Sequence, residues 1–463
     1  MSVPVEFTQV DEVEVDLPGA RVHEHGWQSW SPTATYELTQ QATRPQHVWQ
    51  QVMRFRPETP APAQGFQGEG LLVLDPGTSD PLRVYSATDP TRCVPSIRTQ
   101  LRGAHVVVSA GGPVTVTLAD RRGPYAVERA LAAYGDRSAR QLGTPAPRQS
   151  PTVWCSWYHY FQEVTEADVL ENVDAIARLD LPVDVVQLDG GWEPCVGDWL
   201  GLSSRFRSLG SLVSRIRDTG RRAGIWLAPF TVGSHSELAR DHPAWLVGTD
   251  GASGGSPEYG GTNWDQALHG LDLTHPGAQG YLREAFERLT MIGFDYFKLD
   301  FLYTGALRGS RHGRAGSEPH TDRMVDDGVV AYRTGLELVR DVVGDAYVVG
   351  CGAPILPSVG LLDAMRVSPD VVNPFEQDSG RLRSAPGTVA RAWQHGRYWT
   401  NDPDCLIARP SFRQREQCAA VVERYGGLRS SSDRIADLDD WGLETTRRLL
   451  ADPPPPTPFA GLS

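Results

Sequence analysis

The first 145 residues carry short segments in which apolar and polar positions alternate. The clearest are 71–77, 82–87, 105–110 and 114–119, and Gly, Pro and Asp residues separate them. Alternation with a period of two, interrupted by turn-forming residues, is typical of antiparallel strands. The pattern predicts an antiparallel β-sandwich over residues 1–145, with a helix at 126–142 and a proline-bearing hinge at 143–151.

From residue 152 onward, apolar strand-like segments alternate with helix-like ones. The strand-like segments are 152–158, 183–189, 223–229, 294–303, 347–352, 361–368, 397–402 and 428–432. The helix-like segments are 165–180, 208–220, 278–292, 322–343, 384–396, 411–425 and 437–451. This order is the pattern of a (β/α)₈ TIM barrel. The predicted fold class is therefore α/β, with a barrel over 146–452 after the sandwich and a proline-rich, disordered tail at 453–463.

Two long connections interrupt the predicted barrel, at 231–277 and 304–321, and both are rich in Gly, Ser and His. Loops that follow barrel strands build the mouth of the active site. We expect these connections either to form the rim of a site or to be surface loops that do not contact a substrate.

Composition and charge exclude several classes of function. The chain is 40% apolar and 22% charged, which is typical of a soluble enzyme with a real core. The net charge of −13 argues against nucleic acid and anionic membranes as partners. No apolar run is long enough to cross a bilayer. The acidic N-terminus lacks a signal pattern, and the six scattered cysteines form no CxxC pair, so we expect a cytoplasmic protein with reduced thiols.

Polar residues stand where barrel chemistry is expected. In the segment 294–303, Tyr296, Lys298 and Asp300 share one face, while Phe297, Leu299 and Phe301 share the other. Lys298 is the only lysine among 44 basic residues, so a compact ammonium is retained at this single place. Burying an ammonium and a carboxylate is costly unless they pair or bind a ligand, and both readings are open.

The sixth predicted strand repeats this arrangement with Arg366, Ser368 and Asp370. An arginine lowers the pKa of a neighbouring carboxyl, whereas a general acid needs a raised one, so burial or a second carboxylate must offset Arg366. A simple Arg–Asp clamp is the alternative. Asp189 is a third inward carboxylate, and Asp402 with Asp404 forms a fourth group.

Two inward carboxylates on different strands are the minimum for glycoside hydrolysis. Tryptophan-rich segments at 26–32, 154–160, 189–192 and 224–230 fit a sugar pocket, although core packing is the commoner use of tryptophan. The His23-Glu24-His25 triplet lacks an evident third metal ligand, so we expect it at the surface. His235, His312 and His320 show no ligand spacing.

The chain resembles glycoside hydrolase family 36, the bacterial α-galactosidase group, over nearly its full length. The segments that carry the resemblance are WQSWSP (27–32), WCSWYHYF (154–161), GDWL (197–200), GIWLAPF (224–230), DYFKLDFLYTGA (295–306), GCGAPILPSVGLLDAMRVSPD (350–370) and NDPDCLI (401–407). The resemblance implies a catalytic barrel after a β-sandwich, a retaining double displacement, and no metal or organic cofactor.

The resemblance also implies a role for individual residues. Asp300 matches the nucleophile and Asp370 the acid/base. The implied substrate-binding residues are Asp189 near the galactose 4-hydroxyl, Lys298 and Arg366 on sugar hydroxyls, Trp226 and Cys351 in the pocket wall, Tyr158, and Trp27 or Trp30 on an aromatic loop from the N-terminal domain.

Two departures from the family pattern affect the expected specificity and architecture. The second of two adjacent sugar-binding aspartates is replaced by Gly190, which removes a charged acceptor near O4 and O6. The sequence also stops soon after the eighth strand and its helix, so we expect the C-terminal β domain of many family members to be absent.

The first functional hypothesis is a retaining α-galactosidase that removes terminal galactose from small oligosaccharides. A different or 6-modified sugar, or transfer to a sugar acceptor, keeps the same mechanism. A Schiff-base lyase that uses Lys298 and a non-catalytic sugar binder are the rival readings. The expected partner is a small carbohydrate, without nucleic acid or membrane, and a homo-oligomer is possible.

Overall fold

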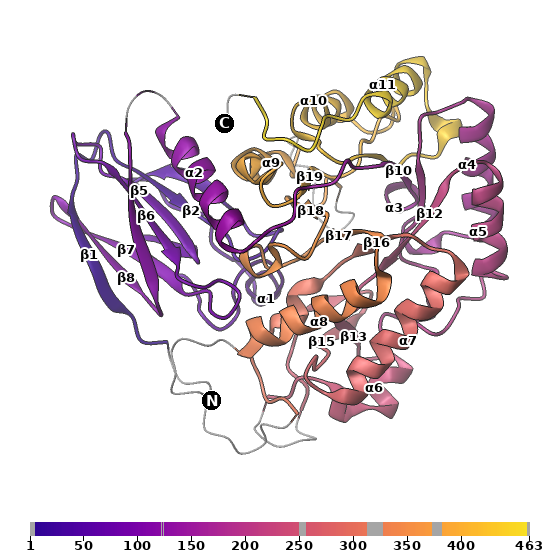
Figure 1. Cartoon of the computed structure of the whole chain (residues 1–463), viewed down its shortest axis with the longest axis horizontal. Coiled ribbons are helices and arrows are strands. Elements are labelled where there is room, and N and C mark those ends of the chain that lie inside the picture. The colour runs from indigo at the N-terminus through magenta and orange to yellow at the C-terminus, as the bar shows by residue number, and fades with distance from the viewer. Residues whose placement is uncertain are drawn as a thin grey trace.

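The computed structural model describes residues 5–121, 123, 125–249, 256–312, 327–372 and 382–460. Two antiparallel sheets at the N-terminal end lie beside a barrel of parallel strands and helices (Figure 1). The prediction of an α/β barrel preceded by antiparallel sheets is confirmed.

The N-terminal sheets face each other across an apolar core. One sheet has the order β1 (Thr8–Glu14), β8 (His105–Ala110), β7 (Ser96–Arg102), β4 (Phe66–Glu69). The other has the order β3 (Ala34–Glu37), β2 (Arg21–Glu24), β5 (Leu71–Asp75), β6 (Leu82–Ala87), β9 (Val114–Ala119). Alternate residues of both sheets, among them Val22, Leu72 and Val106, form this core. The sequence pattern found β5, β6, β8 and β9 and missed the other strands.

Two helices border these sheets. The short helix α1 (Val48–Arg54) follows β3, and α2 (Ala126–Gln141) follows β9. Helix α2 packs against β5 and β6 and also approaches the barrel segment 392–394. It therefore lies between the two halves of the chain (Figure 1).

The barrel contains all eight predicted strands, each shorter than its predicted segment. They are β10 (Thr152–Cys155), β11 (Val185–Leu188), β12 (Arg222–Leu227), β16 (Tyr296–Leu299), β17 (Tyr347–Gly350), β18 (Ala364–Arg366), β19 (Thr400–Asp402) and β20 (Arg429–Ser431). Neighbours pair in parallel in this order, and β20 returns to β10. Strands β19 and β20 are not paired as neighbours in the sheet; isolated hydrogen bonds join their ends, such as Leu428 N donating to Asn401 O at 3.0 Å.

Helices cover the outside of the barrel. They are α4 (Glu166–Arg178), α5 (Leu209–Asp218), α7 (Pro276–Ile292), α8 (Asp327–Val343), α9 (Ala385–Ala390), α10 (Arg415–Tyr425) and α11 (Asp440–Ala451), with the short α3 (Trp157–Tyr160) and α6 (Glu237–Asp241) in loops. A capping box between Thr165 and Asp168 begins α4. The connection between β17 and β18 holds only a 3-10 turn at Leu356–Ser358. Residues 322–326 of the predicted helix 322–343 lie outside the described residues.

The strand predicted at 294–303 differs from the structure in its second half. Strand β16 ends at Leu299, because Phe301 has the left-handed φ of 50° and a 3-10 helix at Leu302–Ala306 follows. Strand alternation therefore does not govern Asp300 and Phe301. Similarly, β18 ends at Arg366, so Ser368 and Asp370 lie on the loop that follows.

The connection 231–277 contains structure that the pattern did not predict. A three-stranded antiparallel sheet has the order β13 (Thr231–Gly233), β15 (Gln266–Gly270), β14 (Thr262–Asn263). Residues 250–255 of this connection, and 313–321 of the connection 304–321, lie outside the described residues.

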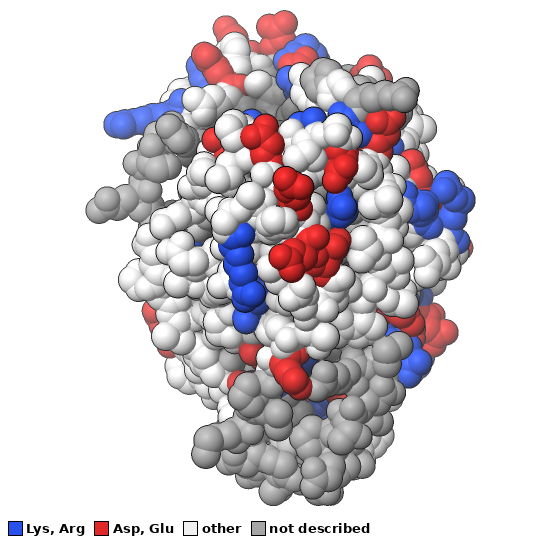
Figure 2. Space-filling view, turned by 90° about the vertical axis from the view of Figure 1, so that its left-hand side faces the viewer, with Lys and Arg blue, Asp and Glu red and all other residues white. Residues whose placement is uncertain are grey.

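The C-terminal segment predicted to be disordered is described up to Ala460. There the Phe459 ring stacks on His395 with 4.0 Å between ring centroids. Within the described ranges, no helix is long and apolar enough to cross a membrane. On the N-terminal face shown in Figure 2, acidic and basic side chains are interspersed among uncharged ones.

Candidate active site

The polar residues singled out from the sequence meet at the carboxyl ends of the barrel strands. Asp189 follows β11, Asp300 follows β16, and Asp370 lies beyond β18, while Lys298 and Arg366 belong to β16 and β18. Loops at this end of a TIM barrel form the active site in the enzymes that use this fold.

Lys298 forms an ion pair with Asp189. Its Nζ lies 2.9 Å from Asp189 Oδ2, which also accepts hydrogen bonds from Gln187 Nε2 at 2.7 Å and from Cys155 Sγ at 3.3 Å. Burial alone would lower the pKa of Lys298, but Asp189 and Cys155 together hold that pKa well above its usual value. The single lysine of this chain is therefore a protonated, buried cation.

Asp300 is held by two neutral donors rather than by a cation. The indole Nε1 of Trp226 donates to Oδ2 at 3.1 Å, and the backbone N–H of Phe301 donates to Oδ1 at 2.8 Å. The side chain of Asp300 is buried. Donors on both oxygens orient a carboxylate without neutralising its charge.

Arg366 contacts three carboxylates. Its guanidinium nitrogens lie 3.1 Å from Asp370 Oδ1, 3.3 Å from Asp402 Oδ2 and 2.7 Å from Asp404 Oδ1. Asp402 and Asp404 are buried, whereas Asp370 is partly exposed. Asp404 also accepts hydrogen bonds from the Tyr158 hydroxyl and from Val371 N.

The pKa of Asp370 is raised, as a general acid requires. Burial of the carboxyl among the surrounding atoms is the largest cause; Arg366 lowers the pKa, and the charge of Asp300 raises it. The side chain remains 39% exposed, so solvent or a substrate can reach it. Burial also raises the pKa of Asp404 to about 6.

Two of the predicted substrate-binding residues are buried close to these carboxylates. Cys351 follows β17 directly, and burial together with the charge of Asp300 raises the pKa of its thiol. Tyr158 is buried behind Arg366, where its hydroxyl bonds Asp404. Tyr158 therefore contacts the polar network of the site and holds Asp404 in place.

The loop 26–32 of the N-terminal region docks onto the barrel. Ser29 N donates to Ala353 O at 3.0 Å, and Ile355 N donates to Trp27 O at 3.0 Å. The ring of Trp30 meets Phe301, the residue after Asp300, edge-on at 4.9 Å between centroids. Trp27 instead lies under the Arg56 guanidinium at 4.8 Å. Of the two tryptophans, Trp30 therefore contacts the residue next to Asp300.

Arg391 fastens this loop to the barrel. Its guanidinium donates to the backbone oxygens of Gln28, Ser29, Ser31 and Val367 at 2.9–3.0 Å. The side chain is fully buried, and burial lowers its pKa to about 9. Nothing in the sequence pattern marked this arginine, because its acceptors are backbone atoms remote in the chain.

The expectation that His23 and His25 lie at the surface is wrong. Both side chains are buried near Arg391: His23 lies in β2, which is mostly buried, and His25 directly follows that strand. Burial lowers the pKa of His23 to about 3. Among the described residues, no group of three His, Cys, Asp or Glu side chains could hold a metal ion.

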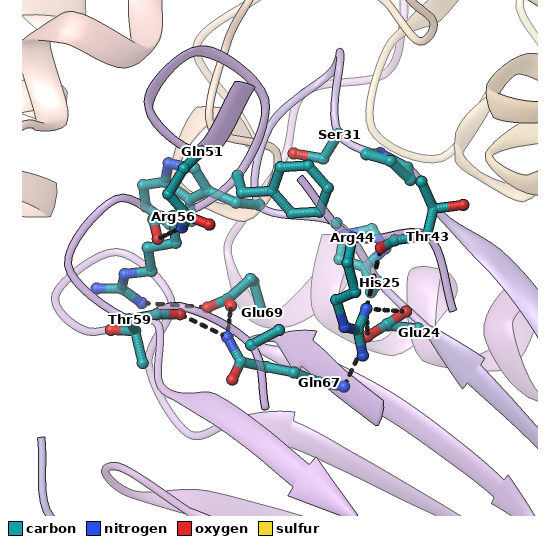
Figure 3. A pocket seen from close by; sticks show the side chains of 15 residues that line it. Glu24, His25, Ser31, Thr43, Arg44, Gln51, Arg56, Thr59, Gln67 and Glu69 are labelled. Atoms are coloured by element: carbon teal, nitrogen blue, oxygen red, sulfur yellow. Dashed lines mark hydrogen bonds and ion pairs between the residues drawn. The ribbon is translucent and has the colours of Figure 1, made fainter. Parts of the chain in front are cut away.

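Beside His25 lies a small pocket of about 30 Å³ (Figure 3). Arg44 pairs with Glu24 at 2.9 Å, Arg56 pairs with Glu69 at 3.6 Å, and Trp27 lines the same space. A volume of this size holds about two water molecules and no sugar. The pocket is part of the polar support beneath the docked loop.

Two of the loop histidines singled out from the sequence are described by the structure. His235 and His312 are exposed, and the His312 ring lies 4.5 Å from His275. His320 lies outside the described residues.

One aromatic residue near the site was missed by the sequence reasoning. Trp264, in the connection 231–277, lies with its ring centroid 4.9 Å from Phe301 and 6.0 Å from Trp226. The sequence feature that could have indicated Trp264 is a bulky aromatic residue within a polar connection, which we expected to form either the rim of a site or a surface loop.

Comparison with known proteins matches this geometry. The Melibiase family model matches residues 142–320. The crystal structure of the Thermus thermophilus α-galactosidase TtGalA with p-nitrophenyl α-D-galactopyranoside has a TM-score of 0.78 and 26% identity over 97% of this chain and 90% of that one. The chain is similar in fold to α-galactosidases, among them members of glycoside hydrolase family 36.

Other family 36 structures share the fold at lower identity. The α-galactosidase AgaA of Geobacillus stearothermophilus has a TM-score of 0.63 and 14% identity, over 95% of this chain and 62% of that one. By sequence alone, AgaA is 29% identical over 25% of this chain and 16% of its own length. AgaSK of Mediterraneibacter gnavus is 28% identical over 22% of this chain and 12% of its own. These curated relatives are thus matched over less than a fifth of their length.

The structure also locates Gly190, where the resemblance places a second aspartate. A Cβ atom at this position would lie 3.4 Å from the nearest ring atom of Trp226, in ordinary van der Waals contact. Its backbone N–H donates to Asp189 Oδ1 at 3.0 Å. The missing side chain therefore leaves space between Asp189 and the tryptophan that bonds Asp300.

Proposed function

We propose that this chain is an α-galactosidase that hydrolyses terminal α-linked galactose from small oligosaccharides by a retaining double displacement. The observation that carries the proposal is the pairing of two unlike carboxyls. Asp300 is fixed by two donors, whereas Asp370 is partly exposed and has a raised pKa. Two carboxyls in different environments suit two different roles in one reaction.

In the first step, an Asp300 oxygen attacks the anomeric carbon while Asp370 donates its proton to the departing glycosidic oxygen. The sugar is then bound covalently to Asp300, and Asp370 is ionised. In the second step, Asp370 removes a proton from water as the water oxygen attacks the anomeric carbon and releases Asp300. Lys298 and Asp189 supply a donor and an acceptor for sugar hydroxyls beside this carbon.

Gly190 supports a second candidate for the sugar, with the same mechanism. With glycine in place of the family aspartate, a substituent on the sugar could lie beside Trp226, so a 6-modified sugar stays a prediction. Transfer of the sugar to a sugar acceptor also stays a prediction. The Schiff-base alternative is disfavoured, because the raised pKa of Lys298 keeps the amine protonated. A cytoplasmic location and a homo-oligomer also stay predictions.

The test compares initial rates on a panel of aryl α- and β-glycosides, with p-nitrophenyl α-D-galactopyranoside as the reference. We expect the α-galactoside to dominate and Asp300→Asn to lower its turnover on the order of a thousandfold or more. Asp370→Ala should reduce turnover of an oligosaccharide about 10²- to 10⁴-fold but affect the activated aryl glycoside much less.

Asp295→Asn is the matched control, because Asp295 immediately precedes β16 and pairs with Arg222 away from the site. It should leave the rates unchanged. Substantial activity in Asp300→Asn would overturn the nucleophile assignment. Equal losses for both substrate types in Asp370→Ala would overturn the acid assignment, and absence of α-galactoside cleavage by the unaltered chain would overturn the proposed sugar.

A further inference from the structure

Two bulky residues beside the candidate active site adopt a backbone conformation that such residues rarely take. Trp264 and Phe301 both have a φ of 50°, in the left-handed region. For an L-residue with a large side chain this region costs about 1–2 kcal/mol relative to the right-handed one. Strain of this kind persists where the surrounding structure imposes it, and it is concentrated at functional sites.

The strain at Trp264 arises from a two-residue hairpin. Strands β14 and β15 pair through Asn263 and Gln266, so Trp264 and Asp265 alone form the turn, and both have positive φ. Turns of this type strongly prefer Asn-Gly or Asp-Gly. A tryptophan at the first turn position is therefore not explained by hairpin formation.

The hairpin is held rigidly against the barrel. The Tyr303 hydroxyl donates to Gly260 O at 2.6 Å, just before β14, and Trp264 N donates to Asn263 Oδ1 at 2.9 Å. A side chain at Gly261 would collide with Met53 of α1, so the N-terminal region closes over the same hairpin. The backbone that carries the Trp264 ring is therefore anchored to the barrel and to α1.

That position is next to the groups that hold Asp300. The Trp264 ring lies 4.9 Å from Phe301, whose N–H donates to Asp300, and 6.0 Å from Trp226, whose indole does the same. Trp30 meets Phe301 at the same 4.9 Å. Phe301 and Trp226 are buried, whereas Trp30 and Trp264 are only half-buried and keep accessible surface.

We infer that Trp264 is a specificity-determining residue that contacts the sugar substrate with its indole. The inference rests on the proposed function. An indole face covers the C–H face of a pyranose, and a ring fixed by its neighbours loses little entropy when it does so. The strained turn is retained because it presents this ring beside Asp300.

The experiment uses Trp264→Gly and Trp264→Asn, since Gly and Asn tolerate positive φ and remove the indole. Tyr125→Gly is the control, because Tyr125 also has a left-handed φ, of 63°, but is 69% exposed at the start of α2. KM and kcat are measured with p-nitrophenyl α-D-galactopyranoside, and Tm is measured for each variant. Binding of free sugars is measured by calorimetry in the Asp300→Asn background, with galactose and glucose as probes.

We expect both Trp264 variants to raise KM about tenfold and to weaken sugar binding by a similar factor, while Tm stays constant or rises. Tyr125→Gly should leave KM unchanged. A lower Tm with unchanged KM and sugar binding would overturn the inference, because Trp264 would then serve packing alone. Lack of turnover by the unaltered chain is failure of the proposed function, and the binding measurement still tests Trp264 in that case.

Discussion

At the scale of single residues, we expect the corner formed by Asp189 and Gly190 to select the sugar. Asp189 is committed to Lys298 through an ion pair of 2.9 Å, so its remaining capacity to accept hydrogen bonds from a substrate is limited. Gly190 has no acceptor to contribute. On the proposed function, the sugar edge that faces this corner meets the Trp226 ring and the backbone of Gly190 instead of a second carboxylate.

Gly190→Asp tests this corner. Position 190 has no left-handed φ and its Cβ would make an ordinary contact with Trp226, so the backbone accepts the change. If the natural sugar is galactose, one new hydrogen bond to a charged group is worth about 1.5–3 kcal/mol and should raise kcat/KM for the α-galactoside roughly 10- to 150-fold. A decrease, measured on the same aryl glycoside panel, would indicate a bulkier or 6-modified sugar.

At the scale of elements, the sequence pattern located the barrel strands but not their ends. All eight were predicted because buried parallel strands are continuous apolar runs, whatever their neighbours are. Strand β16 ends just before Phe301, which has a left-handed φ and whose ring contacts Trp30 and Trp264 from distant segments. A residue-by-residue pattern contains no trace of such contacts.

The same limit applies to the candidate site. Lys298, Asp300, Arg366 and Asp370 could be singled out, because a polar residue in an apolar strand is conspicuous. Their carboxylate partners were singled out as well, but the pairings could not be predicted, because Lys298 pairs with Asp189 more than a hundred residues away and Arg366 contacts three carboxylates at once. The burial of β2 was missed because a strand of mixed polarity resembles a surface strand.

The loop after β11 contains a buried acid that should make stability depend on pH. Glu193 is 5% exposed and accepts a hydrogen bond from Gly191 N at 3.0 Å; burial raises its pKa to about 7. The pKa of Glu193 is higher in the folded chain than in the unfolded chain. The stability that Glu193 contributes is therefore fully present below about pH 4.5 and is lost as the pH rises through 7.

Glu193→Gln should remove this loss, since glutamine keeps the acceptor and cannot ionise. We expect the variant to exceed the unaltered chain in free energy of unfolding by up to about 3 kcal/mol above pH 7, and to match it near pH 4.5. Denaturant titrations across this range measure the difference, with the exposed Glu284→Gln as control. If the free energy of unfolding changed with pH in the same way for all three proteins, Glu193 would not be the source of the pH dependence.

At the scale of the whole molecule, the N-terminal region and the barrel form one site. Arg391 supplies four hydrogen bonds that join the loop of Trp30 to the end of β18, and each goes to a backbone oxygen. The polar pocket around Arg44 and Arg56 supports the same loop from below. The candidate site therefore takes part of its wall from the loop 26–32 of the N-terminal region.

Arg391→Lys keeps the charge and removes the fork that reaches all four oxygens. We expect a destabilisation of about 2–4 kcal/mol, because two or more hydrogen bonds to a charged donor are lost. KM should rise more than kcat falls, since Trp30 is displaced while Asp300 and Asp370 stay in place. Arg222→Lys, at the opposite end of the barrel, is the control. An unchanged KM would show that the loop is held without Arg391.

The single lysine has a consequence for how this chain responds to chemistry from outside. Lys298 is buried in the middle of the barrel and is 7% exposed, so amine-directed reagents meet no lysine on the folded surface. A protease specific for lysine has one bond to cut, and it lies within β16. Cleavage there requires the barrel itself to open. The rate of cleavage after Lys298 therefore reports how often the barrel opens, and local unfolding at the surface does not contribute to it.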